Sequence, residues 1–194
     1  MNKVMITGKV SDFKYEYTTQ RGKKIYTGKI SAARLSGAVD CIEFHTTKSN
    51  IENGKKYATV GEIRTLRTNN YPRKKTYVKI FEFTEVFANR EDENIVEISG
   101  LIKNQLPIRM TPVTNAKLVD FSLRVAEEHS VSYPNVIGWN KIAESVERLG
   151  DNTAVYIKGK LQERMYVKDN NPVTTYEISC FKLEEILDES PFYL

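Results

Sequence analysis

The two halves of this 194-residue sequence repeat one pattern, and the repeat constrains the fold more than any other feature. Residues 2–10 align with residues 94–102, and residues 59–63 align with residues 157–161. Two matches in the same order, at matching positions of each half, indicate two copies of one structural unit of about 90 residues. The fold of this chain must therefore be one that a segment of that size can complete.

Each copy carries the alternation of apolar and polar residues that is typical of half-buried β-strands. The alternation is clearest over residues 155–161, where apolar side chains occupy every odd position except Gly159. Further strands are predicted at residues 95–103, 118–126, 135–140 and 174–183 of the second copy, and at residues 2–17, 24–34, 39–46, 56–66 and 76–86 of the first.

A short helix is predicted between the third and fourth strands of the second copy. Ile142, Val146 and Leu149 share one helical face, and Gly150 follows as a stop signal. Five strands with a helix between the third and fourth are the pattern of an OB-fold barrel. We therefore predict an all-β protein of two tandem five-stranded OB-fold barrels with a short helix in each. The slot in the first copy, at residues 48–54, is shorter, and a single turn is the alternative there.

The segment between the two copies is polar, charged and without periodicity, which indicates a linker. We predict a first domain over residues 1–88, a linker over 89–93, a second domain over 94–186 and a short acidic tail over 187–194.

The net charge of +4 hides an uneven distribution of charged residues between the halves. Residues 1–90 contain 18 Lys and Arg against 8 Asp and Glu, a difference of +10. Residues 91–194 contain 11 against 17, a difference of −6. A strongly basic half indicates a polyanionic partner.

The composition and motifs argue against several classes of protein. Hydrophobic residues make up 40% and charged residues 28% of the chain, no apolar run suits a membrane span, and the first residues lack a signal-peptide pattern. Cys41 and Cys180 lie far apart, which fits a cytoplasmic protein without disulfides or zinc. His45 and His129 have no metal-ligand spacing, and nucleotide-binding and nucleophile motifs are missing. We therefore expect a protein that is not an enzyme and needs no cofactor.

The outward face of the predicted fourth strand in the second copy interleaves basic and aromatic side chains. These residues are Tyr156, Lys158, Lys160, Gln162, Arg164 and Tyr166. Such a face suits single-stranded nucleic acid, because cations neutralise phosphates and rings stack on bases at about 1–3 kcal/mol each. The only tryptophan, Trp139, lies on the third strand, where the alternation leaves open whether it packs in the core or stacks on a base.

The first copy concentrates its positive charge in the two loops that flank the nucleic-acid groove of an OB fold. The clusters are Arg21, Lys23 and Lys24 between the first two strands, and Arg73, Lys74 and Lys75 between the last two. Tyrosines bracket both clusters. We therefore predict that both loops bind the phosphates of a nucleic acid.

An ordered series of segments in the second copy matches a known family. The segments include FSLRVA (121–126), NVIGWNKIAE (135–144), VYIKGKLQERMY (155–166) and TYEI (175–178). Together they resemble the bacterial single-stranded DNA-binding protein (SSB) family over about residues 94–180. The resemblance implies stacking sites at Tyr133, Trp139, Tyr166 and about His129, and a basic contact at Arg164, with Phe44 of the first copy aligned over Trp139.

Two departures from the family concern assembly and partners. Family chains usually carry one OB domain and form tetramers, so two domains in this chain imply a homodimer with four OB folds. The long flexible tail of the family is missing, and its acidic tip recruits replication and repair enzymes. Here Asp188, Glu189, Pro191 and Phe192 resemble a shortened tip that would bind such partners weakly.

We therefore predict a protein that binds single-stranded DNA with little sequence specificity and protects it during replication, recombination or transfer. One alternative is a primosomal-type OB module that acts mainly through protein partners. Another is an RNA-binding OB-fold protein, which competition between DNA and RNA oligomers would distinguish because the 2′-hydroxyl differs.

Overall fold

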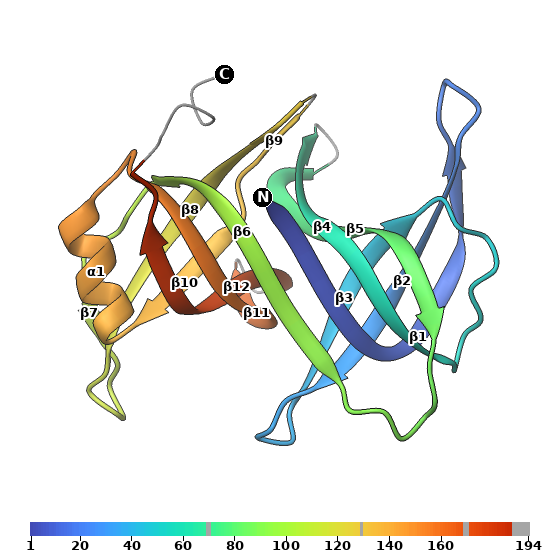
Figure 1. The fold of residues 1–194 in the computed structure, drawn as a ribbon, viewed down its shortest axis with the longest axis horizontal. Coiled ribbons are helices and arrows are strands. Elements are labelled where there is room, and N and C mark those ends of the chain that lie inside the picture. The colour runs from blue at the N-terminus through green and yellow to red at the C-terminus, as the bar shows by residue number, and fades with distance from the viewer. Residues whose placement is uncertain (69–70, 129, 169–170, 188–194) are drawn as a thin grey trace.

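Two β-barrels follow one another along the chain (Figure 1). The computed structural model describes residues 1–68, 71–128, 130–168 and 171–187. The strands of the first barrel are β1 (Asn2–Thr18), β2 (Lys24–Ala33), β3 (Val39–Thr46), β4 (Lys56–Thr68) and β5 (Tyr71–Glu85). They pair in the closed order β1-β2-β3-β5-β4-β1, in which only the β3–β5 pair is parallel.

The second barrel closes in the same order with a helix added. Its strands are β6 (Glu93–Lys103), β8 (Lys117–Glu127), β10 (Asn135–Trp139), β11 (Ala154–Lys168) and β12 (Asn171–Glu185). They pair in the order β6-β8-β10-β12-β11-β6, and the parallel pair is again the third strand with the fifth. The prediction of two tandem five-stranded OB-fold barrels is confirmed.

Three further elements refine the sequence-based picture. The short strands β7 (Arg109–Met110) and β9 (Ser130–Ser132) both pair with β8. The helix α1 (Lys141–Leu149) packs on the second barrel and buries Ala143 and Val146. Among the described residues, no helix is long and apolar enough to cross a membrane.

The predicted helix of the first copy is wrong. Residues 48–54 form a loop and turn, because the connection between β3 and β4 is five residues shorter than the one that holds α1. Ile51 fills the core there instead, 7% exposed, and the Glu52 N–H donates to the Tyr57 hydroxyl at 3.1 Å.

A glycine at the same position of both copies allows the first strand of each barrel to bend across its neighbour. A Cβ atom on Gly8 would lie 2.2 Å from the carbonyl oxygen of Ser31, and one on Gly100 would lie 2.6 Å from that of Arg124. Any side chain would push these strands apart, so the repeated glycine is explained by barrel closure.

The first strands of the two barrels join them into one sheet. β1 and β6 pair antiparallel with Val4 opposite Val96, and both side chains are buried. Around this pair the register is symmetric, because Asn2 faces Ile98 and Ile6 faces Asn94. The copies are therefore related by a local twofold axis, and β5-β4-β1-β6-β11-β12 form a continuous run of strands (Figure 1).

Two seams flank this central pairing. In the first, the Tyr176 hydroxyl on β12 donates to the Cys41 carbonyl on β3 at 2.9 Å and accepts from the Glu43 N–H at 3.2 Å. In the second, Arg64 on β4 forms an ion pair with Glu127 at the end of β8. In the first seam β3 also contacts β11, and in the second β4 contacts the short strand β9.

Candidate nucleic-acid interface

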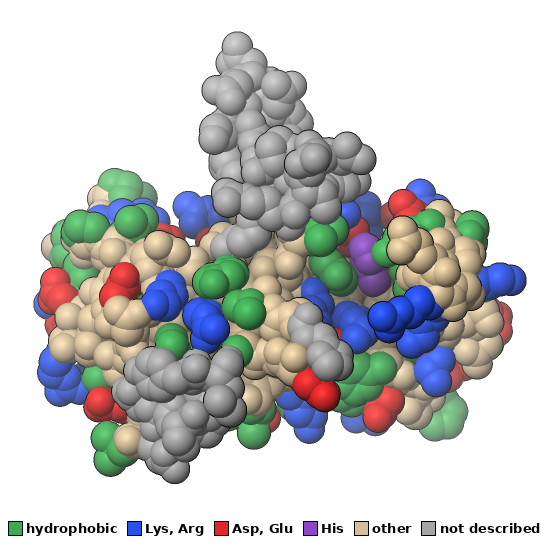
Figure 2. Space-filling view, turned by 90° about the horizontal axis from the view of Figure 1, so that it is seen from above, with side chains coloured by type: hydrophobic (Ala, Val, Ile, Leu, Met, Phe, Trp, Pro, Cys, Tyr) green, Lys and Arg blue, Asp and Glu red, His purple; other side chains and the backbone are tan. Residues whose placement is uncertain are grey.

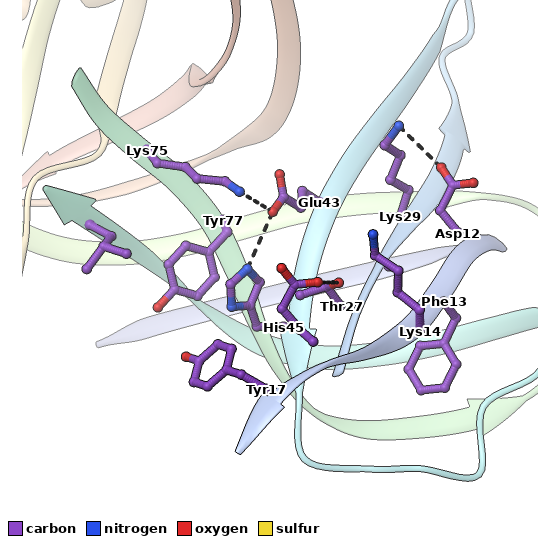
Figure 3. A pocket seen from close by; sticks show the side chains of 13 residues that line it. Asp12, Phe13, Lys14, Tyr17, Thr27, Lys29, Glu43, His45, Lys75 and Tyr77 are labelled. Carbon is purple, nitrogen blue, oxygen red and sulfur yellow. Dashed lines mark hydrogen bonds and ion pairs between the residues drawn. The ribbon is translucent and has the colours of Figure 1, made fainter. Parts of the chain in front are cut away.

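A groove of about 670 Å³ runs over the outer face of the first barrel, between the end of β1 and strands β2, β3 and β5 (Figure 3). Its lining includes four rings, three lysines and three carboxylates. The rings are Phe13, Tyr17, His45 and Tyr77, the lysines are Lys14, Lys29 and Lys75, and the carboxylates are Asp12, Glu16 and Glu43. Figure 2 shows basic side chains gathered around a hollow on this barrel.

Strand alternation directs these side chains into the groove. On β3, Ile42, Phe44 and Thr46 are buried in the barrel, whereas Glu43 and His45 between them point outward. On β5 the same alternation buries Val78 and Ile80 and leaves Lys75, Tyr77 and Lys79 outside. Because β3 and β5 are parallel neighbours, their outward residues form one surface.

The floor of this groove contains a stacked ring pair. The centroids of His45 and Tyr77 lie 4.1 Å apart with 25° between their planes. Tyr17, 48% exposed, comes from the facing end of β1. Burial raises the pKa of the Tyr77 hydroxyl, so this ring stays neutral at physiological pH. Flat neutral surfaces of this kind are suited to stacking on bases.

Two of the three lysines that line the groove are paired with carboxylates. Lys75 Nζ lies 2.5 Å from Glu43 Oε1, and Lys29 Nζ lies 3.3 Å from Asp12 Oδ2. Although burial opposes its ionisation, hydrogen bonds with His45 and Lys75 hold the pKa of Glu43 below its ordinary value. The groove itself is thus balanced in charge, and the excess positive charge must come from its rims.

The rims carry the predicted basic clusters. Arg21, Lys23 and Lys24 are exposed at the β1–β2 hairpin. Arg73 and Lys74 lie on β5 beside the β4–β5 turn, and their side chains are outside the described part of the structure. The first cluster thus lies in the predicted loop. The second lies on β5 and not in a loop, because this strand begins at Tyr71, five residues earlier than predicted.

The corresponding face of the second barrel has a groove of about 720 Å³ with a different lining. Arg164 on β11 pairs with Glu177 on β12 at 3.0 Å, and Arg109 pairs with Asp120 at 2.9 Å. Among the described residues that line it, Phe121 is the only aromatic one. Of the residues predicted on the fourth-strand face, this groove includes Arg164.

The other predicted residues of the second copy are spread over several places. Trp139, at the end of β10, and Tyr133 are each 39% exposed, and the Tyr133 N–H donates to Thr65 Oγ1 of the first barrel at 2.8 Å. Lys158 and Lys160 lie on β11 outside both grooves, where Lys158 pairs with Glu97 of β6 at 2.8 Å. The side chain of Tyr166 lies outside the described structure, as do His129 and the tail residues Asp188, Glu189, Pro191 and Phe192. Their roles, like stacking by Trp139 and Tyr133, stay predictions.

The prediction that Phe44 corresponds to Trp139 and binds nucleic acid is corrected. Phe44 is fully buried, with its ring against Phe13 and Phe83 at centroid distances of 6.3 and 5.5 Å. Strand pairing places Phe44 opposite Val78 and places Val136 opposite Ile178, so its counterpart is the buried Val136. A ring in the core cannot reach a base without opening the barrel.

The groove residues that were not among the predicted site residues include Glu43, His45, Lys14, Lys29 and the rings Phe13, Tyr17 and Tyr77. For Glu43 and His45 the signal was present in the alternation of β3, where they flank the inward Phe44. The groove residues come from four separate strands, so they form no cluster along the sequence. Among the described residues, no group of His, Cys, Asp and Glu could hold a metal ion.

The fold and the groove define a tandem OB-fold protein with an aromatic groove bordered by cations. Two solved structures share this fold over nearly the whole chain. The wild-type single-stranded DNA-binding protein from Thermus aquaticus matches with a TM-score of 0.76 and 16% identity, over 96% of this chain and 93% of that one. A variant of that protein, with a deletion and one substitution, matches with a TM-score of 0.77 and 16% identity, over 97% and 95%.

At this level of identity the likeness establishes the shared fold, and the predicted resemblance to SSB proteins holds at that level. No protein-family model matches the sequence, and no curated protein matches it.

Proposed function

We propose that the protein binds single-stranded DNA without requiring a particular sequence, and protects it during replication, recombination or transfer. The observation that carries the proposal is the first-barrel groove, in which the stacked His45–Tyr77 pair lies between rims that bear cations. Rings that stack on bases and cations that neutralise phosphates are the two contacts that single strands need. The Thermus proteins that share the fold are described as single-stranded DNA-binding proteins.

Trp139 offers a direct test because it is the only tryptophan and its side chain is 39% exposed. Titration with oligo(dT) is expected to quench its fluorescence, and the affinity is expected to fall linearly with the logarithm of salt concentration. Duplex DNA of equal length should bind far more weakly. Absence of quenching would contradict stacking by Trp139, and affinity that ignores salt would contradict the proposed function.

Substitution of Trp139 tests whether its ring stacks on a base, in an assay that does not depend on tryptophan fluorescence. We expect Trp139→Ala to weaken binding of an end-labelled oligonucleotide by about 1–3 kcal/mol at every salt concentration, because stacking does not depend on counterions. Trp139→Phe keeps a ring and should lose less. The same assay with RNA of equal sequence tests the alternative ligand, and tighter binding of RNA would replace DNA in the proposal.

We further propose that two copies associate and bring four barrels together. Met5 and Ile95 lie opposite each other at the centre of the shared sheet, on its outer face and half-buried. The local twofold axis gives this face the self-complementary symmetry that a dimer interface uses. Light scattering should give twice the chain mass of 22.3 kDa, and Met5→Glu should return it to one chain. A wild-type mass of one chain would exclude the dimer.

A further inference from the structure

A carboxylate lies on the floor of the first groove, where its negative charge opposes the binding of phosphates. Glu43 lies next to the stacked pair, two residues before His45 on the same face of β3 (Figure 3). Outward residues of one strand are spaced about 7 Å apart, so a base stacked on the rings would have its edge near this carboxylate.

The position of Glu43 is fixed at both its backbone and its side chain. Its N–H donates to the Tyr176 hydroxyl of the second barrel at 3.2 Å. Its Oε1 atom accepts from Lys75 Nζ at 2.5 Å and lies 3.4 Å from His45 Nε2. An acceptor held in this way loses little freedom when a ligand arrives, which favours selective recognition.

The second oxygen of the carboxylate retains acceptor capacity. Both side-chain partners reach Oε1, and no hydrogen bond or ion pair from another described residue reaches Oε2. The Glu43 side chain is 25% exposed, so a ligand in the groove can approach it. An ionised carboxylate only accepts hydrogen bonds, and it therefore selects ligand edges that donate.

We propose that Glu43 reads the edge of the stacked base and that the first groove prefers bases with an exocyclic amino group, cytosine in particular, over uracil and thymine. This inference rests on the proposed binding of single-stranded DNA. The N4 amino group of cytosine donates to a carboxylate, whereas the O4 atom of uracil or thymine presents lone pairs at the same position. The preference concerns one base position, so binding of other sequences persists.

The test compares oligo(dC) with oligo(dU) of about 15 nucleotides, because the two bases have the same ring size and lack the thymine methyl group. We expect the wild-type protein to bind oligo(dC) about three- to tenfold more tightly than oligo(dU) in a competition assay. Glu43→Gln should bring this ratio to about one, since its amide can donate to O4 as well as accept. Glu43→Gln also releases Lys75, which can raise the affinity for both oligonucleotides. Such a general gain cancels in the ratio of the two affinities.

Glu62→Gln is the matched control. Glu62 is 17% exposed and accepts hydrogen bonds from Arg64 and Lys79, as Glu43 does from its partners, but it lies outside the groove. It should keep the wild-type ratio, and circular dichroism should show both variants folded. Equal wild-type affinity for the two oligonucleotides, or a preference that survives Glu43→Gln, would overturn the inference and leave the proposed function intact. Failure to bind either strand would overturn both.

Discussion

Phe44 and Gly28 show how single residues fix the core of the first barrel. They face each other across β2 and β3, and a Cβ on Gly28 would lie 2.7 Å from the Phe44 ring. At the matching positions of the second barrel, Phe121 faces Val136. The aromatic ring therefore comes from the third strand in one barrel and from the second strand in the other. This exchange keeps the core of each barrel filled, and it leaves Phe44 without an aromatic residue at the matching position of the third strand in the second copy.

Substitution of Phe44 and of Tyr77 should separate stability from binding. Phe44→Leu is expected to lower the free energy of unfolding by about 1–2 kcal/mol through imperfect filling of the core, with little change in DNA affinity. Tyr77→Leu should lower DNA affinity with little change in the free energy of unfolding, because Tyr77 contributes its ring to the groove and not to the core. Urea titration and oligonucleotide binding measure the two effects, and an equal loss of affinity in both variants would contradict the assignment.

At the scale of elements, alternation identified every barrel strand to within about five residues at its ends. The strands β7 and β9 were not predicted, because two or three residues carry no period. The groove was only partly predictable. Its charged rims are visible in sequence, whereas the meeting of His45 and Tyr77 depends on the parallel pairing of β3 with β5, which no local pattern encodes.

Glu62 joins β4 to β5 and should make stability depend on pH. Although burial opposes its ionisation, hydrogen bonds from Arg64 and Lys79 hold the pKa of Glu62 below its ordinary value. A carboxylate with a lowered folded-state pKa stabilises the protein above its unfolded pKa, and this stabilisation is lost as pH falls through the folded value. The difference in unfolding free energy between wild type and Glu62→Gln should be greatest near neutrality and vanish in acid. A difference that is independent of pH would show that Glu62 acts by packing.

The β1–β2 hairpin should set the salt dependence of binding. Replacing Arg21, Lys23 and Lys24 by Gln is expected to reduce the slope of log affinity against log salt by about 2, because each phosphate contact to a single strand contributes about 0.7. The control replaces Lys55, Lys117 and Lys182, which are paired with carboxylates outside both grooves. If both triple variants change the slope equally, the hairpin has no specific role.

At the scale of the whole molecule, the two grooves share a structural element. Tyr176 lies on β12 between Thr175 and Glu177, which line the second groove. Its hydroxyl crosses the first seam and holds the backbone of Cys41 and Glu43, and Glu43 lines the first groove. Tyr176 is 6% exposed, and burial raises the pKa of its hydroxyl, so it remains a neutral hydrogen-bonding group. A shift of β12 on binding DNA would therefore be transmitted to β3.

This arrangement predicts energetic coupling between the grooves. Lys75→Gln in the first groove and Arg164→Gln in the second should have non-additive effects on affinity, with an interaction energy of about 0.5–1 kcal/mol. Tyr176→Phe removes only the hydroxyl and should make the two effects additive, because distant sites without a shared partner act independently. Tyr57→Phe is the control: Tyr57 is 4% exposed, and its hydroxyl accepts from Glu52 within the first barrel. Coupling that survives Tyr176→Phe would mean that the central β1–β6 pairing carries it instead.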